Sequence, residues 1–149
     1  MEVINYFTSD NKDHWLSEIA KSDWSAGEYL ATLLREEKLS ELVGDGVRVL
    51  MLTEGERIIS FCTLASVDDV QPTDLTPWIG WIYTFPQYRG NRYAGLLLQY
   101  AENLAKADGH QSVYISTNHT GLYEKYGYSL HKIMKDIEGE DTRVYWKSI

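Results

Sequence analysis

Two arginines and a glycine stand at a turn of the sequence that is suited to bind a phosphate group. The apolar run Trp78–Phe85 predicts a strand, and Ala94–Lys106 carries apolar residues at helical spacing. The turn between them holds Arg89, Gly90 and Arg92. Unpaired backbone N–H groups and the positive end of a helix dipole converge where such a turn enters a helix. The turn therefore predicts a phosphate site.

Two common nucleotide-binding patterns do not fit this turn. Gly90 and Gly95 match the glycines of a P-loop, but Leu96 and Leu97 stand where that loop needs Lys and then Ser or Thr. The dinucleotide-binding pattern of three glycines fails as well, because position 92 is an arginine. The phosphate ligand is therefore neither kind of nucleotide.

The turn resembles the acyl-coenzyme A signature of the GNAT N-acetyltransferase superfamily, Arg/Gln-x-x-Gly-x-Gly/Ala. Arg89 and Gly90 match it, Ala94 satisfies its last position, and Arg92 stands where the family prefers Gly. Because an arginine tolerates positive φ poorly, Arg92 can instead take helical angles and direct its guanidinium at the phosphates.

A second segment, Asn118–Tyr128, strengthens this resemblance. It follows the predicted strand Ser112–Thr117 and is similar to the superfamily's segment Asn … Leu-Tyr-Glu-Lys-x-Gly-Phe, with Tyr123 at the tyrosine. The two matches occur in the expected order, and together they cover residues 78–135. On these motifs the chain is identified as a member of the superfamily.

The resemblance implies a cofactor, acetyl-coenzyme A, and a set of residues that bind it. Its pantetheine arm is expected to pair with the strand backbone at Ile82, Tyr83 and Thr84, and Asn118 is expected to hydrogen-bond the arm. The diphosphate is expected to lie on the turn formed by Arg89, Gly90, Asn91, Arg92, Tyr93, Ala94 and Gly95. Tyr123 is expected to be the catalytic acid, which protonates the sulfur of coenzyme A.

The group that removes the proton from the amine is left open by the sequence. The strand Trp78–Phe85 contains no Asp or Glu, and the candidates lie elsewhere: Glu54, Asp68, Asp69, Asp74 and His119. Trp24, Trp78 and Trp81 could line an acceptor pocket, although core and edge packing explains most of the aromatic residues better. No pair of residues has metal-ligand spacing, so no metal is expected.

Composition narrows the class of protein and of partner. The 149 residues, 44% of them apolar, suffice for one globular domain, which we expect to span residues 1–149. A net charge of −8 argues against nucleic acid and anionic membranes, and favours a cationic substrate. The absence of a signal-like or membrane-spanning segment, and the single Cys62, predict a cytoplasmic protein.

The predicted elements follow the order β-α-α-β-β-β-α-β-α-β-β. Ser25 and Glu28 have the spacing of a capping box for the second helix, whose buried stripe is predicted to be Tyr29, Leu30, Leu33 and Leu34. Glycines predict a hairpin at Gly55 and the end of the helix Ala94–Lys106 at Gly109, and residues 121–126 are expected to form a short helix. The resemblance implies an α+β fold, in which a mixed, mainly antiparallel sheet of seven strands has helices on both faces. Strands Trp78–Phe85 and Ser112–Thr117 would run parallel and splay apart, leaving a cleft for the pantetheine arm.

The predicted function is N-acetyltransfer from acetyl-coenzyme A to a primary amine, by direct attack in a ternary complex. The acidic composition favours a small cationic amine as the acceptor. Two alternatives stay open: a non-catalytic acyl-coenzyme A-binding or regulatory domain, and an acetyltransferase that acts on proteins or peptides. Members of the superfamily often dimerise, which leaves a homodimer open as well.

Overall fold

The structure is a computed structural model that describes residues 1–149. The helices are α1 (Lys12–Ala20), α2 (Ser25–Arg35), α3 (Leu39–Val43) and α4 (Tyr93–Ala107). The strands are β1 (Glu2–Asn5), β2 (Arg48–Glu54), β3 (Arg57–Ala65), β4 (Trp78–Thr84), β5 (Ser112–Thr117), β6 (Ser129–Lys135) and β7 (Asp141–Ser148). Short 3₁₀ turns lie at Tyr6–Thr8, Pro86–Tyr88 and Glu124–Tyr126.

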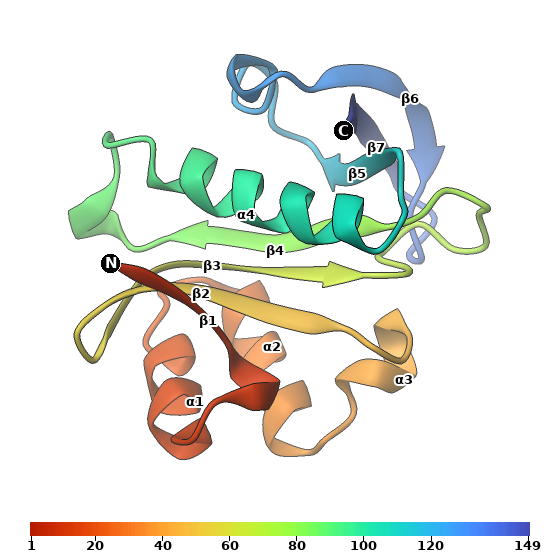
Figure 1. Cartoon of the computed structure of the whole chain (residues 1–149). Helices are drawn as coiled ribbons and strands as arrows, with labels where there is room; N and C mark the ends of the chain where they lie inside the picture. The colour runs from red at the N-terminus through yellow and green to blue at the C-terminus, as the bar shows by residue number, and fades with distance from the viewer.

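All seven strands form one sheet in the order β1-β2-β3-β4-β5-β7-β6. Every neighbouring pair is antiparallel except β4 and β5, which run parallel and pair at a single position, Trp78 with Tyr114. Helices α1, α2 and α3 cover one face of the sheet, and α4 covers the other (Figure 1). The predicted fold class is therefore confirmed, and β4 and β5 diverge beyond their one paired position.

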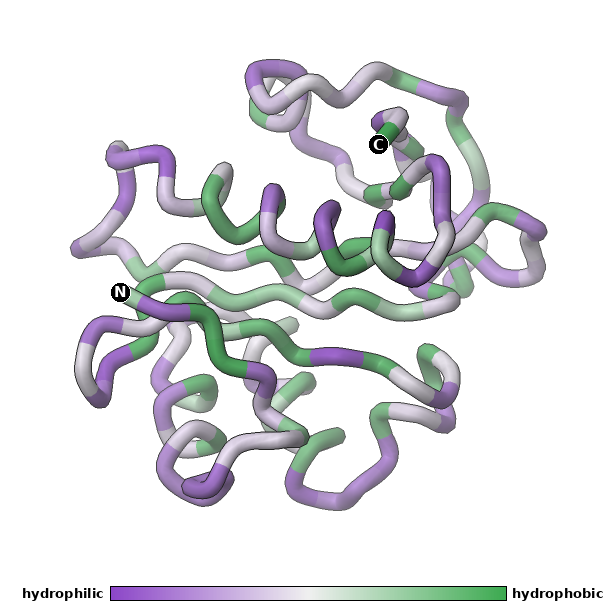
Figure 2. The backbone as a smooth tube through the Cα atoms, in the orientation of Figure 1, coloured by the Kyte–Doolittle hydropathy of each residue, from purple (hydrophilic) through white to green (hydrophobic).

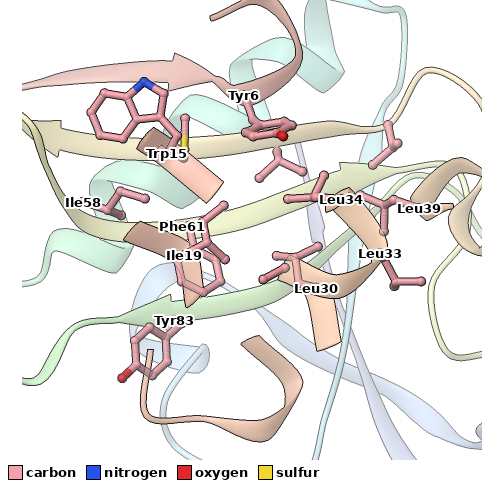
Figure 3. Close-up of a cluster of buried hydrophobic side chains, with 14 of the residues drawn as sticks. Tyr6, Trp15, Ile19, Leu30, Leu33, Leu34, Leu39, Ile58, Phe61 and Tyr83 are labelled. Atoms are coloured by element: carbon pink, nitrogen blue, oxygen red, sulfur yellow. The ribbon is translucent and has the colours of Figure 1, made fainter. Parts of the chain in front are cut away.

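Two hydrophobic cores hold these layers together. On one face, α1, α2 and α3 pack on β2, β3 and β4 through residues that include Trp15, Ile19, Leu30, Leu34, Phe61 and Tyr83 (Figure 3). On the other face, α4 packs through Leu97, Leu98, Ala101 and Ala105. Figure 2 shows the same arrangement, with hydrophobic residues along the central strands. No helix is both long and apolar enough to cross a lipid bilayer.

Three local predictions were wrong. Ser25 does not cap α2: it is already helical, and the carbonyl of Trp24 accepts the N–H groups of Gly27 and Glu28 instead. Tyr29, predicted to be buried with the apolar stripe of α2, is 51% exposed. The expected helix over residues 121–126 shrinks to one 3₁₀ turn, because Gly121 takes a φ of +81° and cannot continue a right-handed helix.

Candidate active site

A cavity of about 700 Å³ opens where β4 and β5 diverge. Its walls come from six places in the chain: the start of α2, the end of α3, the β3–β4 loop, the middle of β4, the end of β5 with the segment after it, and the β6–β7 turn. More than half of the lining residues are hydrophobic, and a few polar groups are placed among them. A largely apolar cavity with a few polar groups is the usual form of a small-molecule site.

A bulge in β4 shapes the floor of this cavity. On β3, Phe61 and Thr63 are two residues apart, but their partners on β4, Tyr83 and Gly80, are three apart. The extra residue lies at Trp81, whose φ of +46° is unusual for a bulky side chain. A bulge interrupts the regular ladder and leaves its extra residue unpaired. Backbone groups of β4 are thereby released beside the cavity.

The three strand residues predicted to bind the pantetheine arm do not share one environment. The carbonyl of Tyr83 accepts a hydrogen bond from Ser60 of β3 at 2.7 Å, and the Tyr83 ring packs in the hydrophobic core (Figure 3). The N–H of Phe85 also bonds to β3, and because backbone groups alternate in direction along a strand, those of Ile82 and Thr84 point away from β3. The carbonyl of Thr84 accepts from Arg89 Nε at 2.9 Å. Of the three, only Ile82 lines the cavity.

The turn into α4 leaves its backbone N–H groups without partners. None of the N–H groups of residues 90–94 has an acceptor within the protein. Gly90 takes a φ of +83°, which glycine adopts without strain. These donors stand together at the positive end of a 15-residue helix, so the local field and the free N–H groups both favour an anion.

Tyr123 lines the same cavity from the segment that follows β5. Its side chain is only 5% exposed, and its hydroxyl makes no hydrogen bond within the protein. Burial raises the pKa of Tyr123 above its ordinary value, with smaller contributions from Cys62 and Tyr126. The phenol therefore carries its proton at neutral pH. Asn118, also predicted from the sequence, lines the cavity at the end of β5 and is exposed.

Among the candidate proton acceptors, Asp68 has the most unusual surroundings. It lies against the bare backbone of Gly80 next to the β4 bulge, so that a Cβ on Gly80 would stand 3.0 Å from Asp68 Cγ. Burial, and then the neighbouring charge of Asp69, raise the pKa of Asp68 to about 7. Asp69 lies beside it, and burial together with the charge of Asp136 raises its pKa too. Both carboxylates line the cavity.

The other candidate acids and bases are less well placed. Glu54 pairs with the amino group of Met1 at 3.0 Å and does not line the cavity. Asp74 is exposed on the β3–β4 loop and does not line it either. His119 lines the cavity and is exposed.

The sequence matches the acetyltransferase (GNAT) family over residues 11–128, which is most of the chain. This chain belongs to the GNAT acetyltransferase family. The family predicted from the two motifs is confirmed, and with it the class of enzyme, an acetyltransferase. No curated protein matches the chain by sequence.

Solved structures share the GNAT fold along nearly the whole chain. One is an aminoglycoside 6'-N-acetyltransferase complexed with coenzyme A, with a TM-score of 0.71, 15% identity, and 99% of this chain and 97% of that chain covered. A second is the aminoglycoside 6'-N-acetyltransferase from Enterococcus faecium, with a TM-score of 0.69 and the same identity and coverage. A third is a GNAT acetyltransferase from Elizabethkingia anophelis with acetyl-CoA bound, with a TM-score of 0.68, again at 15% identity and the same coverage. At this identity the likeness shows the fold.

Arg92 takes a left-handed backbone conformation, which glycine, the residue that the GNAT signature prefers at this position, adopts with less strain. Its φ of +60° and ψ of +26° lie in the left-handed region, so the expected helical angles are wrong. Its guanidinium lies over the ring of Tyr126, with Cζ 4.9 Å from the ring centroid. Arg89 likewise lies over the ring of Tyr83, at 5.4 Å, and neither arginine forms an ion pair. The turn therefore offers its backbone N–H groups more directly than its cations.

The tertiary structure also adds residues to this GNAT site that the sequence did not single out. The N–H of Ile137 donates to the carbonyl of Asp69 at 2.7 Å and brings the β6–β7 turn, with Asp136 and Glu138, onto the cavity. Of the tryptophans, Trp24 and Trp81 line the cavity, but Trp78 is fully buried in a small core with Val70 and Val144. No regular spacing links these segments, so only their contact in space could identify them.

Proposed function

We propose that this chain transfers the acetyl group of acetyl-coenzyme A to a primary amine of a small cationic molecule, by direct attack in a ternary complex. The observation that carries this proposal is one cavity lined both by Tyr123, a protonated phenol, and by Asp68, a carboxylate whose pKa is about 7. An acid for the leaving group and a base for the amine are the two groups that the reaction needs.

Residues of the cavity and of the turn into α4 fit coenzyme A. The free N–H groups of residues 90–94 would hold the diphosphate, and the backbone at Ile82 with the side chain of Asn118 would hold the pantetheine arm. Structures of the same fold contain coenzyme A or acetyl-CoA, which supports this choice. Acetyl-coenzyme A supplies the acetyl group as a thioester.

Tyr123 is proposed as the proton donor. Acetyl transfer forms a C–N bond and breaks a C–S bond, and the departing sulfur takes up a proton. The Tyr123 hydroxyl is free of partners within the protein, and burial keeps it protonated at neutral pH. Its proton is therefore available, and a sulfur anion is the group that would take it.

Asp68 is proposed as the proton acceptor. An alkyl amine is mostly an ammonium ion at neutral pH and must lose a proton before or during attack. A carboxylate with a pKa near 7 is about half ionised at pH 7, and it binds a proton far more strongly than an ordinary aspartate. The contact of Asp68 with Gly80 places it at the β4 bulge, in the wall of the cavity.

The acceptor is proposed to be cationic because the cavity carries negative charge without a basic partner. Asp68, Asp69, Asp136 and Glu138 all line it, and none of them forms an ion pair with a lysine or arginine. One carboxylate oxygen of Asp69 is buried and has no hydrogen-bond partner. Aromatic rings of Trp24, Tyr29 and Trp81 also line the cavity, and an aromatic face attracts a cation.

Calorimetry with coenzyme A and a thiol-release assay over a panel of acceptors test the proposal. The panel contains monoamines, linear diamines and triamines, amino sugars, neutral amino acid amides and a short peptide. We expect turnover to be fastest for acceptors with two or more amino groups. Binding of coenzyme A without turnover on any acceptor would favour a non-catalytic domain. A preference for the peptide would favour an enzyme that modifies proteins.

A further inference from the structure

We propose that Arg92 is a positioning residue, which ties the turn that holds the diphosphate to the segment that carries Tyr123. This inference rests on the proposed function, because it gives Tyr123 a role in the reaction. It assigns Arg92 a task other than contact with phosphate, since its guanidinium is held by Tyr126 and by the backbone of Lys125. We call this the Arg92–Tyr126 contact.

The contact has three parts, all of which join the start of α4 to the turn Glu124–Tyr126. The guanidinium of Arg92 lies over the Tyr126 ring at 4.9 Å, and its Nη2 donates to the carbonyl of Lys125 at 3.5 Å. The same ring lies against Gly95 in the first turn of α4, where a Cβ would stand 2.6 Å from Tyr126 Cε1. Only a glycine at position 95 allows the ring to approach the helix so closely.

Tyr126 is in turn bound to the backbone of Tyr123. The N–H groups of Tyr126 and Tyr128 both donate to the carbonyl of Tyr123, at 2.9 and 3.2 Å. A shift of Tyr126 is therefore transmitted to the peptide that carries the proposed acid. A second attachment lies further along α4, where the Tyr128 hydroxyl donates to Glu102 at 2.7 Å. Of the two attachments between α4 and the segment that carries Tyr123, only the Arg92–Tyr126 contact involves the turn 89–95, which is proposed to hold the diphosphate.

The left-handed conformation of Arg92 separates the role of its side chain from the role of its backbone. A glycine would take the same φ with less strain and would leave the N–H groups of the turn in place. An arginine adds only its side chain, and that side chain packs on Tyr126. The backbone of the turn can therefore bind the diphosphate, while the side chain couples the turn to Tyr123.

The test compares Arg92→Gly, Tyr126→Leu and the double variant, with Tyr126→Phe as a matched control that keeps the ring. Coenzyme A affinity is measured by calorimetry, and kcat by thiol release with the best acceptor. Each single variant removes the cation–π contact between Arg92 and Tyr126, so we expect each to lower kcat about fivefold and the double variant to lower it no further. Coenzyme A affinity should change less than about twofold, and Tyr126→Phe should behave as the wild type.

Amide hydrogen exchange supplies a readout that does not depend on turnover. In the wild type, coenzyme A should slow exchange both in the turn 89–95 and in the segment 121–128. In Arg92→Gly the turn should still be protected, and the segment should lose the protection that coenzyme A confers.

Three results would overturn the inference. The first is a tenfold or greater loss of coenzyme A affinity in Arg92→Gly while kcat stays unchanged. The second is a double variant whose loss of kcat equals the sum, in free energy, of the losses in the two single variants. The third is an Arg92→Gly variant in which coenzyme A protects the segment 121–128 from exchange as it does in the wild type. Failure of the proposed function is distinguishable, because it would appear as absent turnover in the wild type whatever the variants do.

Discussion

Replacing Asp68 by asparagine should make the protein more stable and less active at the same pH. The substitution keeps the size of the side chain and removes its charge. In the wild type, burial and Asp69 raise the pKa of Asp68 from the ordinary 3.8 to about 7. The folded protein therefore binds a proton more tightly than the unfolded chain, and the wild type loses stability as the pH rises from about 4 to about 7.

The size of the effect follows from these two pKa values. The difference between 3.8 and about 7 corresponds to roughly 4 kcal/mol of unfolding free energy above pH 7. Asp68 keeps part of its surface in solvent, so we expect about half of this, roughly 2 kcal/mol, to be recovered in Asp68→Asn at pH 8. For a chain of this length, that is a rise in Tm of about 4–8 °C. At pH 4 the two proteins should differ little.

Activity should move in the opposite direction. If Asp68 accepts the proton from the amine, Asp68→Asn should lower kcat/KM about 10²-fold at pH 8. The ratio of wild-type to variant kcat/KM should grow tenfold for each pH unit up to about 7 and then become constant. The ratio is the useful quantity, because ionisation of the free amine affects both proteins equally.

The assay combines thermal unfolding and thiol release at several pH values between 4 and 9. Asp74→Asn is the matched control, since Asp74 lies on the same loop but is exposed and outside the cavity. We expect it to change neither Tm nor kcat/KM. The reasoning would be refuted if Asp68→Asn kept wild-type activity, or if its Tm difference from the wild type were the same at pH 4 and pH 8.

Three further predictions concern other parts of the site. Tyr123→Phe should lower kcat about 10²-fold or more, with coenzyme A affinity close to the wild type; an unchanged rate would remove the phenol from the mechanism. Gly80→Ala should displace the Asp68 carboxylate and lower kcat/KM, and the loss should be absent when Asp68 is already Asn. Glu102→Ala should reduce the unfolding free energy by about 3 kcal/mol in chemical denaturation, because Lys147 and a buried phenol lose their common acceptor; a loss below about 1 kcal/mol would contradict this.

The sequence by itself determined the seven strands, the helices α1, α2 and α4, and the two motifs, but not α3. The strand predicted at Ser112–Thr117 has the same bounds in the structure, and the helix after the phosphate turn is capped by Asp108, with Gly109 next to it at a positive φ. The hairpin at Gly55 was predicted from its glycine, and the position of Tyr123 after β5 was predicted from the second motif. Apolar periodicity, glycine and a short motif are local properties, and they act over a few residues.

Only the tertiary structure decided how these elements meet. The β4 bulge at Trp81 arises from its pairing with β3, the guanidinium of Arg92 packs on Tyr126, and Asp68 is buried beside the backbone of Gly80. Asp68 and Asp74 lie on the same polar loop and have the same side chain, yet one lines the cavity and the other is exposed. Burial and neighbouring charge set the proton affinity of a carboxyl group, and both arise only when distant segments pack together.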